Sequence, residues 1–437
     1  MSNLFQTHFT PAELTDRRAR VLGAIGPEAV ALVQGAAPPR GFVAFRQTNE
    51  LYYLTGLEVP QAYLLLDGRS RRSTLYLPPR RETPGAEGDT LGAQDEALIR
   101  AHTGVDAVRP LDQLAGDLAG AATVYTPHMP AEGFQSSRDE MQHADRLIAA
   151  DPWDAAPTRE QRLIALLTER LPGVAIADLS PITDRMRGVK SPAEVAVMRR
   201  AGELSAQAIV AAMRATRAGL YEYQLNALAN QVYLDGGGRG EGYRSITAAG
   251  AANIWFAHYW RCDCELRDGD LILMDTAPDY GYYTSDIGRM WPVNGTYSAQ
   301  ARELYGFVVE YHLAVLAAIR PGLTADQVHA AAAEVMAPVV ERWPWSRPEY
   351  AAAGRRMLDF RGHLSHPVGM IVHDVDNYTL RPLEPGVVFA VDPQMWVPEE
   401  KLYIRCEDTV VVTADGMENL TAAAPLGLDE VEAFLRG

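Results

Sequence analysis

Five side chains able to bind metal ions follow one another in the second half of the chain, mostly at the ends of apolar segments. They are four carboxylates and one imidazole: Asp275, Asp286, His366, Asp392 and Glu407. Two adjacent divalent cations need such a set of ligands. Because these side chains must converge from separate strands, the set predicts a strand-built site and a dinuclear metallohydrolase.

The first two carboxylates lie in the segment LILMDTAPDYGYYTSDIGRMW, which is typical of two strands joined by a tight turn. A turn centred on Tyr280 and Gly281 places Asp275 directly opposite Asp286 on one face of the hairpin. Their Cβ atoms would then lie about 4.5–5.5 Å apart. Because paired ions in hydrolases lie roughly 3.5–4 Å apart, we expect this one hairpin to bridge both.

The last two carboxylates repeat this arrangement. Asp392 ends the apolar segment VVFAV, and Glu407 opens the segment CEDTVVVT. A buried carboxylate without a partner is costly, so acids at the ends of buried strands indicate metal or ion pairing rather than a solvated surface. Oxygen ligands with one imidazole favour Mn²⁺, with Co²⁺ or Zn²⁺ as substitutes. Such ions make hydroxide from a bridging water near neutral pH, so that amide cleavage needs no Ser or Cys nucleophile.

The chain is expected to form two domains, because 437 residues are too many for one ordinary core. Residues 1–175 alternate short apolar strands with helical stretches, as in a mixed α/β domain, and residues 176–437 form an α+β domain. A boundary fits near residues 174–190. The segments 82–95 and 128–160 are rich in Gly, Pro and charge, and we expect them to be long loops.

Two helix starts are marked by capping boxes. Ser191 and Glu194 predict a helix that begins at the entry to the second domain and stops at Gly219. Thr324 and Gln327 predict another. The helices flank the strands that carry the predicted ligands.

The charge balance excludes some function classes. There are 56 acidic residues against 40 Lys and Arg, a net charge of −16, which argues against nucleic acid and anionic membranes as partners. Neither a signal-peptide pattern nor an apolar stretch of about 20 residues occurs, so we expect a cytoplasmic protein. Cys262, Cys264 and Cys406 are too few for a disulfide framework, and their spacing is not that of a zinc site.

Long segments of the sequence resemble the Xaa-Pro peptidase family, the aminopeptidase P and prolidase group of pita-bread metallopeptidases. They are RDGDLILMDTAPDYGYYTSDIGRMWPVNG, HLSHPVGMIVHD, LEPGVVFAVDP and IRCEDTVVVT, with FRQTNELYYLTGLEVPQAYLLL similar to the N-terminal domain and GVKSPAEVAVMRRAGELS to the catalytic entry. The resemblance implies an α+β pita-bread (creatinase/aminopeptidase-like) catalytic domain over residues 176–437, preceded by a smaller α/β creatinase/prolidase-like domain over residues 1–175.

The resemblance implies hydrolysis of the bond between an N-terminal residue and proline, with two divalent ions as cofactor. The substrate is then a small peptide with proline in second position, and the assembly a homodimer. One ion is assigned to Asp275 and the second to His366 and Asp392, while Asp286 and Glu407 bridge both. Glu407, or Asp392 beside it, is expected to accept the proton of the bridging water.

Two further histidines match family positions that contact the substrate carbonyl. His258 in FAHY and His373 in IVHD are expected to stabilise the oxyanion as charge develops. His373 follows His366 by seven residues, which is the family spacing.

Three residues are expected to bind substrate. Arg405 matches an arginine that lines the proline pocket, and Tyr243 lies at a similar position near that pocket. Arg46, in the N-terminal domain, would pair with the free carboxylate of a dipeptide if that domain caps the cleft. Arg46 therefore favours dipeptides, the prolidase reaction, over the longer peptides of aminopeptidase P.

The sequence departs from the family pattern around the predicted site. Asp392 stands where the family has Glu, in a VEPG motif that reads VDPQ here, and DITRT reads DIGRM, so Gly288 lacks a hydroxyl. HGLSH reads GHLSH, which displaces His363 by one position, and AANIWFAHY is one residue longer than usual. The shorter Asp392 is expected to weaken binding of the second ion. Because all five ligands remain, we expect an active enzyme.

Three other classes compete with this interpretation. A metal-free creatine-cleaving amidinohydrolase would lack the five ligands. A non-catalytic pita-bread peptide-binding module would have no reason to retain them. Methionine aminopeptidase shares the catalytic fold but normally lacks the N-terminal domain that carries FRQTNELYYLTG.

Overall fold

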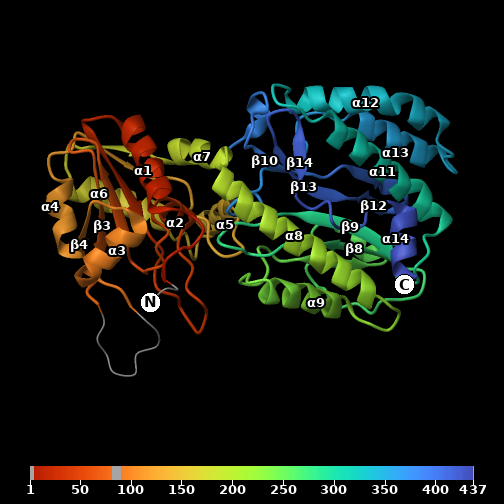
Figure 1. The fold of residues 1–437 in the computed structure, drawn as a ribbon, viewed down its shortest axis with the longest axis horizontal. Helices are drawn as coiled ribbons and strands as arrows, with labels where there is room; N and C mark the ends of the chain where they lie inside the picture. Colours follow the sequence, from red (N-terminus) through yellow and green to blue (C-terminus); the bar gives the residue numbers. More distant parts are fainter. Residues whose placement is uncertain (1–3, 81–89, 437) are drawn as a thin grey trace. The chain divides into compact units, whose positions relative to one another are not determined.

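The computed structural model describes residues 4–80 and 90–436, and its chain divides into two compact units, Met1–Arg187 and Gly188–Gly437 (Figure 1). Each unit has its own sheet and its own apolar core. Residues 82–89 of the predicted loop 82–95 lie outside the described residues. Its end forms a short 3₁₀ turn, Ala93–Asp95.

The first unit is built on a six-stranded mixed sheet with the order β4-β3-β2-β1-β5-β6. β1 pairs antiparallel with β2 and parallel with β5, so apolar residues such as Val30, Leu32 and Val124 meet in the core. The strands are β1 (Ala29–Gln34), β2 (Tyr63–Asp67), β3 (Arg72–Leu77), β4 (Ala107–Pro110), β5 (Thr123–Thr126) and β6 (Ala175–Asp178). The helices are α1 (Pro11–Ile25), α2 (Asn49–Thr55), α3 (Glu96–Thr103), α4 (Leu114–Leu118), α5 (Arg138–Ala150), α6 (Arg159–Arg170) and α7 (Ser180–Gly188).

The first unit ends at Arg187, inside the predicted boundary region 174–190 and twelve residues after the predicted domain end at residue 175. β6 pairs parallel with β5, from Thr123↔Ala175 to Thr126↔Asp178, and so completes the sheet of this unit. Arg187 is held in the same unit by ion pairs from its Nη1 atom to Glu132, at 2.9 Å, and to Glu50, at 3.4 Å. Strand β6 and Arg187 therefore belong to the first unit.

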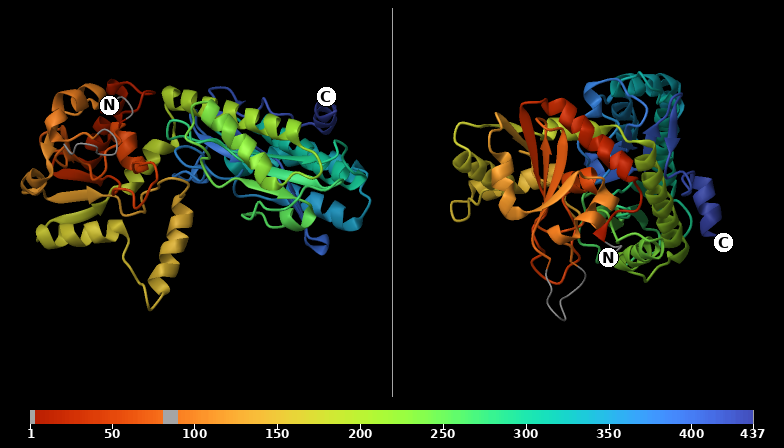
Figure 2. Two further views of the ribbon diagram at one scale, coloured as in Figure 1. Left: turned by 90° about the horizontal axis from the view of Figure 1, so that it is seen from below. Right: turned by 60° about the vertical axis from the view of Figure 1, so that its left-hand side comes forward.

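The second predicted loop, 128–160, contains the helix α5. Its N-terminal Arg138 forms ion pairs with Glu50, Glu132 and Asp184, whereas no residue of the helix is fully buried. Figure 2 shows α5 standing away from the strands of its unit. The prediction of a loop was wrong here because the segment is rich in charge yet has helical spacing of its apolar residues.

The second unit carries the strand order β10-β13-β9-β8-β7, with β14 pairing to β13 and a separate β11–β12 hairpin. Figure 1 shows α8 and α9 below these strands and α11 to α13 above them. The strands are β7 (Ile246–Ala249), β8 (Leu271–Asp275), β9 (Ile287–Pro292), β10 (Val388–Val391), β11 (Gln394–Val397), β12 (Leu402–Arg405), β13 (Glu407–Val412) and β14 (Met417–Asn419). The helices are α8 (Pro192–Ala215), α9 (Glu222–Asp235), α10 (Ala251–Ile254), α11 (Ala299–Ala318), α12 (Ala325–Arg342), α13 (Pro348–Asp359) and α14 (Leu428–Leu435).

Both predicted capping boxes begin helices. Ser191 caps α8 and Thr324 caps α12, each with its side chain accepting a hydrogen bond from the third helical residue. α8 ends at Ala215, four residues before the predicted stop at Gly219, because Thr216 is extended and its hydroxyl accepts a hydrogen bond from the Trp291 indole at 2.9 Å. None of the described helices is long and apolar enough to cross a membrane.

Candidate metal centre

Three neighbouring strands place two of the predicted carboxylates in one row. β8 ends at Asp275, β13 begins at Glu407, and Gly288 of β9 pairs with both. A Cβ atom on Gly288 would lie 3.1 Å from the Cβ atom of Glu407 and 3.5 Å from its Oε2 atom. The absence of a side chain at Gly288 therefore keeps the space between the two carboxylates open.

The hairpin that carries Asp275 and Asp286 differs in register from the prediction. Asp275 pairs with Gly288, not with Asp286, because the turn is centred on Gly281 and Tyr282. Both turn residues have positive φ, 59° and 71°, as a two-residue primed turn requires. A tyrosine rarely adopts this conformation, so the sequence carried no signal for it. The shift of two residues keeps both acids on one face, as diagonal neighbours.

His366 and Asp392 are brought in by β10 and the loop beside it. The backbone N–H of Ala390 in β10 donates to the carbonyl of His366 at 3.0 Å. The N–H of Asp392, just after β10, donates to the carbonyl of Leu364 at 3.2 Å. β10 pairs antiparallel with β13, and the pair Val391↔Asp408 puts the next residue, Asp392, beside Glu407. Four separate segments therefore deliver the five predicted ligands.

Asp286, His366 and Glu407 form the tightest group. The Nε2 atom of His366 lies 3.3 Å from Oδ2 of Asp286 and 3.7 Å from Oε1 of Glu407. One ligand atom from each of the three residues lies within 4.8 Å of the other two. Asp286 and Glu407 are buried. This spacing suits a common cation.

Arg405 and Tyr243 connect the remaining two acids, Asp275 and Asp392, to this group. The Arg405 guanidinium contacts Asp275, lies 2.5 Å from Oε2 of Glu407, and lies 3.4 Å from Oδ2 of Asp392. The Tyr243 hydroxyl lies 2.6 Å from Asp275 Oδ1 and 2.5 Å from Asp286 Oδ1. Sequence reasoning missed these direct contacts between Arg405, Tyr243 and the acids, because family motifs match positions rather than side-chain partners. The proline-pocket role of both residues stays a prediction.

The electrostatics of the cluster reflect crowded, buried carboxylates. Burial, followed by the neighbouring charge of Glu407, raises the pKa of Asp392 to about 7. Burial and nearby acids also raise the pKa values of Asp286 and Glu407. Burial opposes ionisation of Asp275 as well, but the Arg405 guanidinium lowers its pKa below the ordinary value. Burial opposes protonation of His366, but Asp286 and Glu407 raise its pKa well above the ordinary value, so Arg405 and His366 together face four crowded acids.

These residues fit divalent metal ions. Oδ1 of Asp392 is buried and accepts no hydrogen bond from any described residue. The donor set is one imidazole and carboxylate oxygens, which suits Mn²⁺ and related ions and differs from the thiolate set of a structural zinc site. The excess of negative charge and the unpaired oxygen both favour cations bound among the five side chains.

The two predicted oxyanion histidines occupy different surroundings. The ring of His373 lies 4.2 Å from that of His366, centroid to centroid, so the structure brings it to the cluster. His258 is exposed in the segment after α10 and stacks on Trp260 at 5.7 Å. Among the described residues, no hydrogen bond or ion pair joins His258 to the five predicted ligands. Contact of either histidine with a substrate carbonyl stays a prediction.

Arg46 belongs to the first unit, where its Nη2 atom lies 3.5 Å from Oδ1 of Asn49. The described contact is therefore with a neighbouring side chain of the same unit. Pairing of Arg46 with a dipeptide carboxylate stays a prediction.

A second buried network lies behind Glu407. Successive residues of a strand face opposite ways, so Asp408 points away from the cluster. Its carboxylate binds Arg289 Nη2 at 2.7 Å, His312 Nε2 at 2.8 Å and the Thr421 hydroxyl at 2.5 Å. Arg289 also donates to the carbonyl of Glu407 at 2.6 Å. This network holds the backbone of Glu407, and strand alternation in CEDTVVVT was the signal that could have revealed it.

Replacing Asp408 with Asn is expected to lower the free energy of unfolding at neutral pH by about 3–5 kcal/mol, because Arg289 keeps its buried charge without its partner. Burial opposes ionisation of Asp408, but Arg289 and His312 hold its pKa below the ordinary 3.8. This stabilisation is therefore present above pH 3.8 and is lost as pH falls through the lower folded-state value. Urea unfolding at several pH values should show the difference from wild type shrinking below about pH 4.

Asp429 offers a matched control, since its carboxylate is largely exposed and pairs with Arg302 at 2.9 Å. Asp429→Asn should change the free energy of unfolding by less than about 1 kcal/mol. A loss for Asp408→Asn no greater than for this control would show that the buried network contributes nothing.

Known proteins match the chain over both units. The profile of metallopeptidase family M24 matches residues 196–414, and that of the aminopeptidase P N-terminal domain matches residues 14–127. The Xaa-Pro aminopeptidase of Escherichia coli K12 is 33% identical over 415 residues, covering 90% of this chain and 89% of its own. Xaa-Pro aminopeptidase 3 of Mus musculus is 28% identical over 411 residues, covering 89% and 76%.

Solved structures agree with these matches. Aminopeptidase P from E. coli with the inhibitor Pro-Leu superposes with a TM-score of 0.78 at 29% identity, covering 98% of this chain and 99% of its own. Proline aminopeptidase P II from Yersinia pestis has a TM-score of 0.78 at 31% identity, covering 98% and 100%. The predicted pita-bread domain and its smaller α/β companion domain are thereby confirmed.

Proposed function

The chain belongs to metallopeptidase family M24 and carries an aminopeptidase P N-terminal domain, and from this premise we propose that it is a two-metal Xaa-Pro aminopeptidase. It would release the N-terminal residue of peptides that have proline in second position. The observation that carries this proposal is the convergence of Asp286, His366 and Glu407, with Asp275 and Asp392 joined to them through Arg405.

The two ions would be held by the five predicted ligands, with Asp275 on one ion and His366 with Asp392 on the other. Asp286 and Glu407, at the centre of the group, are proposed to contact both. When bound, the ions supply Lewis-acid activation of the peptide carbonyl and of water. We propose Mn²⁺ on the strength of the oxygen-rich ligand set, and weaker binding of the second ion because Asp392 is short.

The side chains around the ions have separate tasks in this proposal. Glu407, or Asp392 beside it, would accept a proton from water, with its basicity set by the bound ions. His373, whose ring lies beside that of His366, would donate to a carbonyl oxygen as this oxygen gains negative charge. Tyr243 orients Asp275 and Asp286 through its hydroxyl. His258 is proposed to assist at the oxyanion from its loop.

Substrate length separates the two forms of this activity. The named relatives are aminopeptidases, which supports longer Xaa-Pro peptides over the dipeptide preference predicted from Arg46. The same relatives give no support to a non-catalytic peptide-binding module. The predicted homodimer and cytoplasmic location stay predictions.

Hydrolysis of Ala-Pro-Gly-Gly and of Ala-Pro by metal-depleted protein given Mn²⁺ tests the proposal. We expect Mn²⁺-dependent release of alanine from both, with the higher kcat/KM on the tetrapeptide. No release from either peptide would contradict the proposed function. A dipeptidase would instead show the higher kcat/KM on Ala-Pro, and Arg46→Ala would then cost more on Ala-Pro than on the tetrapeptide.

A further inference from the structure

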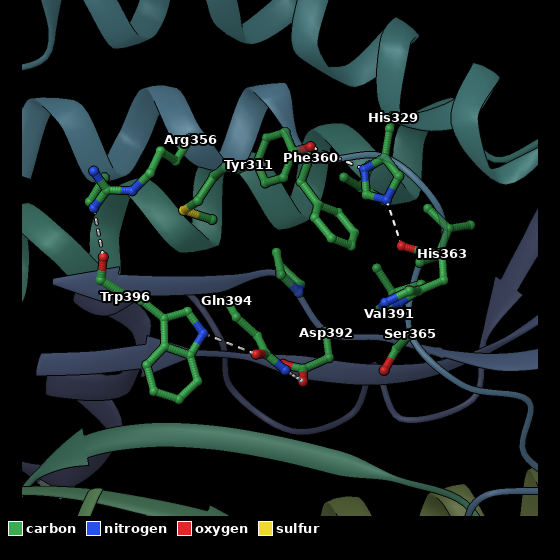
Figure 3. A pocket seen from close by; sticks show the side chains of 15 residues that line it. Tyr311, His329, Arg356, Phe360, His363, Ser365, Val391, Asp392, Gln394 and Trp396 are labelled. Atoms are coloured by element: carbon green, nitrogen blue, oxygen red, sulfur yellow. Dashed lines mark hydrogen bonds between the residues drawn. The ribbon is translucent and has the colours of Figure 1, made fainter. Parts of the chain in front are cut away.

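The chain segment 363–376 carries a predicted metal ligand and the predicted oxyanion residue His373. Its first part borders a cavity of about 380 Å³ beneath α11 to α13, which Asp392 also borders, and Figure 3 shows His363 and Ser365 in this wall. All residues of the segment are described, and none of them belongs to a helix or a named strand. Contacts with other segments must therefore set the position of the His373 ring.

Backbone hydrogen bonds fix the first half of this segment. The N–H of Val368 donates to the carbonyl of Val388 in β10, at 3.1 Å. The carbonyl of Gly369 accepts from the N–H of Thr284, at 2.9 Å, in the connection between β8 and β9. The segment is thus joined to β10 and to the hairpin of the predicted ligands before it reaches His373.

Asp374, directly after His373, fixes the second half. Its N–H donates to the carbonyl of Pro367 at 2.9 Å and so closes the loop that contains His373. Its carboxylate pairs with the Nζ atom of Lys190 at 3.2 Å, and both side chains are 1% exposed. The N–H of Lys190 donates in turn to the carbonyl of Gly386 at 2.8 Å. The position of Asp374, and with it that of His373, therefore depends on a buried lysine.

The space around this ion pair is narrow. A Cβ atom on Gly369 would collide with the Asp374 carboxylate and lie 2.9 Å from the Cε atom of Lys190. The pair therefore lies against the backbone of the segment itself. A compact ammonium group suits this space better than the broad, planar guanidinium of arginine. The buried carboxylate needs this partner, because removal of one member of a buried pair leaves the charge of the other uncompensated.

The basic residues of the whole chain indicate the same need for a lysine. Lys190 and Lys401 are the only lysines among the 40 Lys and Arg residues. Lys401 is exposed and follows the 3₁₀ turn Pro398–Glu400. A chain that uses arginine for nearly all of its positive charges thus has one of its two lysines buried against Asp374.

We propose that Lys190 is a positioning residue for His373. Through Asp374 it holds the His373 imidazole beside that of His366, with 4.2 Å between the ring centroids. This inference rests on the proposed function, in which His373 stabilises the oxyanion. Because an oxyanion donor must point at the oxygen that gains charge, a loss of its orientation lowers the rate without removing the ions.

Substitution of each of the two lysines tests this role. Lys190→Met should lower kcat on Ala-Pro-Gly-Gly by roughly 10- to 100-fold, since loss of a whole oxyanion donor costs about 100- to 1,000-fold. KM and the bound metal per chain should stay within about two-fold of wild type, because the lost interaction is made in the transition state. Lys401→Met is the matched control and should retain the wild-type rate.

A double-mutant cycle separates positioning of His373 from a general effect on the structure. In a His373→Ala background, Lys190→Met should cost less than about two-fold in kcat, because the residue that it positions is absent. Equal losses in the two backgrounds would overturn the proposal. Asp374→Asn keeps the shape of the side chain and is the second variant, with the same expectations, if Lys190→Met melts below the assay temperature.

Nuclear magnetic resonance of protein with ring-labelled histidine gives a readout that needs neither metal nor substrate. The His373 signal, assigned by its loss in His373→Ala, should shift in metal-free Lys190→Met but not in Lys401→Met. A shifted signal in a protein that cleaves no Xaa-Pro peptide would keep the positioning role and overturn the peptidase. An unshifted signal in a protein that does cleave such peptides would overturn the positioning role and keep the peptidase.

Discussion

Glu407→Gln is expected to lower kcat/KM on Ala-Pro-Gly-Gly by roughly a thousand-fold at saturating Mn²⁺, equivalent to ~4 kcal/mol of transition-state stabilisation. Glu407 lies in one row with Asp275, next to Asp392, and 3.7 Å from His366. An amide at this position loses the charge that both proposed ions share and the proposed acceptor of the proton from water. Elemental analysis of the purified variant should show less bound metal per chain than in wild type.

Glu418→Gln is a suitable control for this experiment, because Glu418 forms a half-exposed pair with Arg199 away from the candidate centre. It should retain both the rate and the metal content of wild type. Retention of full metal content and full rate by Glu407→Gln would contradict the place given to Glu407 at the centre of the site.

Arg405→Met is expected to destabilise the metal-free protein by about 3–5 kcal/mol, because Asp275, Asp392 and Glu407 lose the one guanidinium that contacts them all. The acids should take up protons in response. Since bound ions supply positive charge at the same carboxylates, Mn²⁺ should raise the melting temperature of this variant more than that of wild type. Calorimetric melting of chelator-treated protein, with and without Mn²⁺, measures both effects.

The exposed pair of Arg199 with Glu418, at 2.6 Å, supplies the matched comparison. Arg199→Met makes the same substitution in a solvated ion pair and should lower the free energy of unfolding by less than about 1 kcal/mol. A metal-free Arg405→Met protein that melts like Arg199→Met would show that the guanidinium does not stabilise the acids.

The sequence pattern predicted the hairpin that carries Asp275 and Asp286 but not its register. The hairpin itself and the common face of the two acids followed from strand alternation and a turn signal. The register did not, since it depends on positive φ at Tyr282, a conformation that a buried tyrosine adopts only within its packed surroundings. The acids are consequently diagonal neighbours bridged by Tyr243 rather than direct opposites.

Some helix boundaries likewise followed from the sequence, and others did not. The starts of α8 and α12 were predicted because a capping box acts within four residues. The end of α8 at Ala215 depends on Thr216 and on Trp291, which lies in β9. The helix α5 was missed because its segment is rich in charge, and the acids that pair with its first residue, Glu50 and Asp184, are distant in sequence.

The sequence by itself determined the family, the two-domain fold and the identity of the five candidate ligands, because these depend on long motifs and on local periodicity. Only the tertiary structure decided which atoms meet: that Arg405 and Tyr243 bind the acids, that Asp408 turns away to Arg289, and that Asp392 borders a cavity beneath α11 to α13. The physical reason is that side-chain partners from distant segments are set by strand register and helix packing. Strand register and helix packing cannot be predicted from any single stretch of sequence.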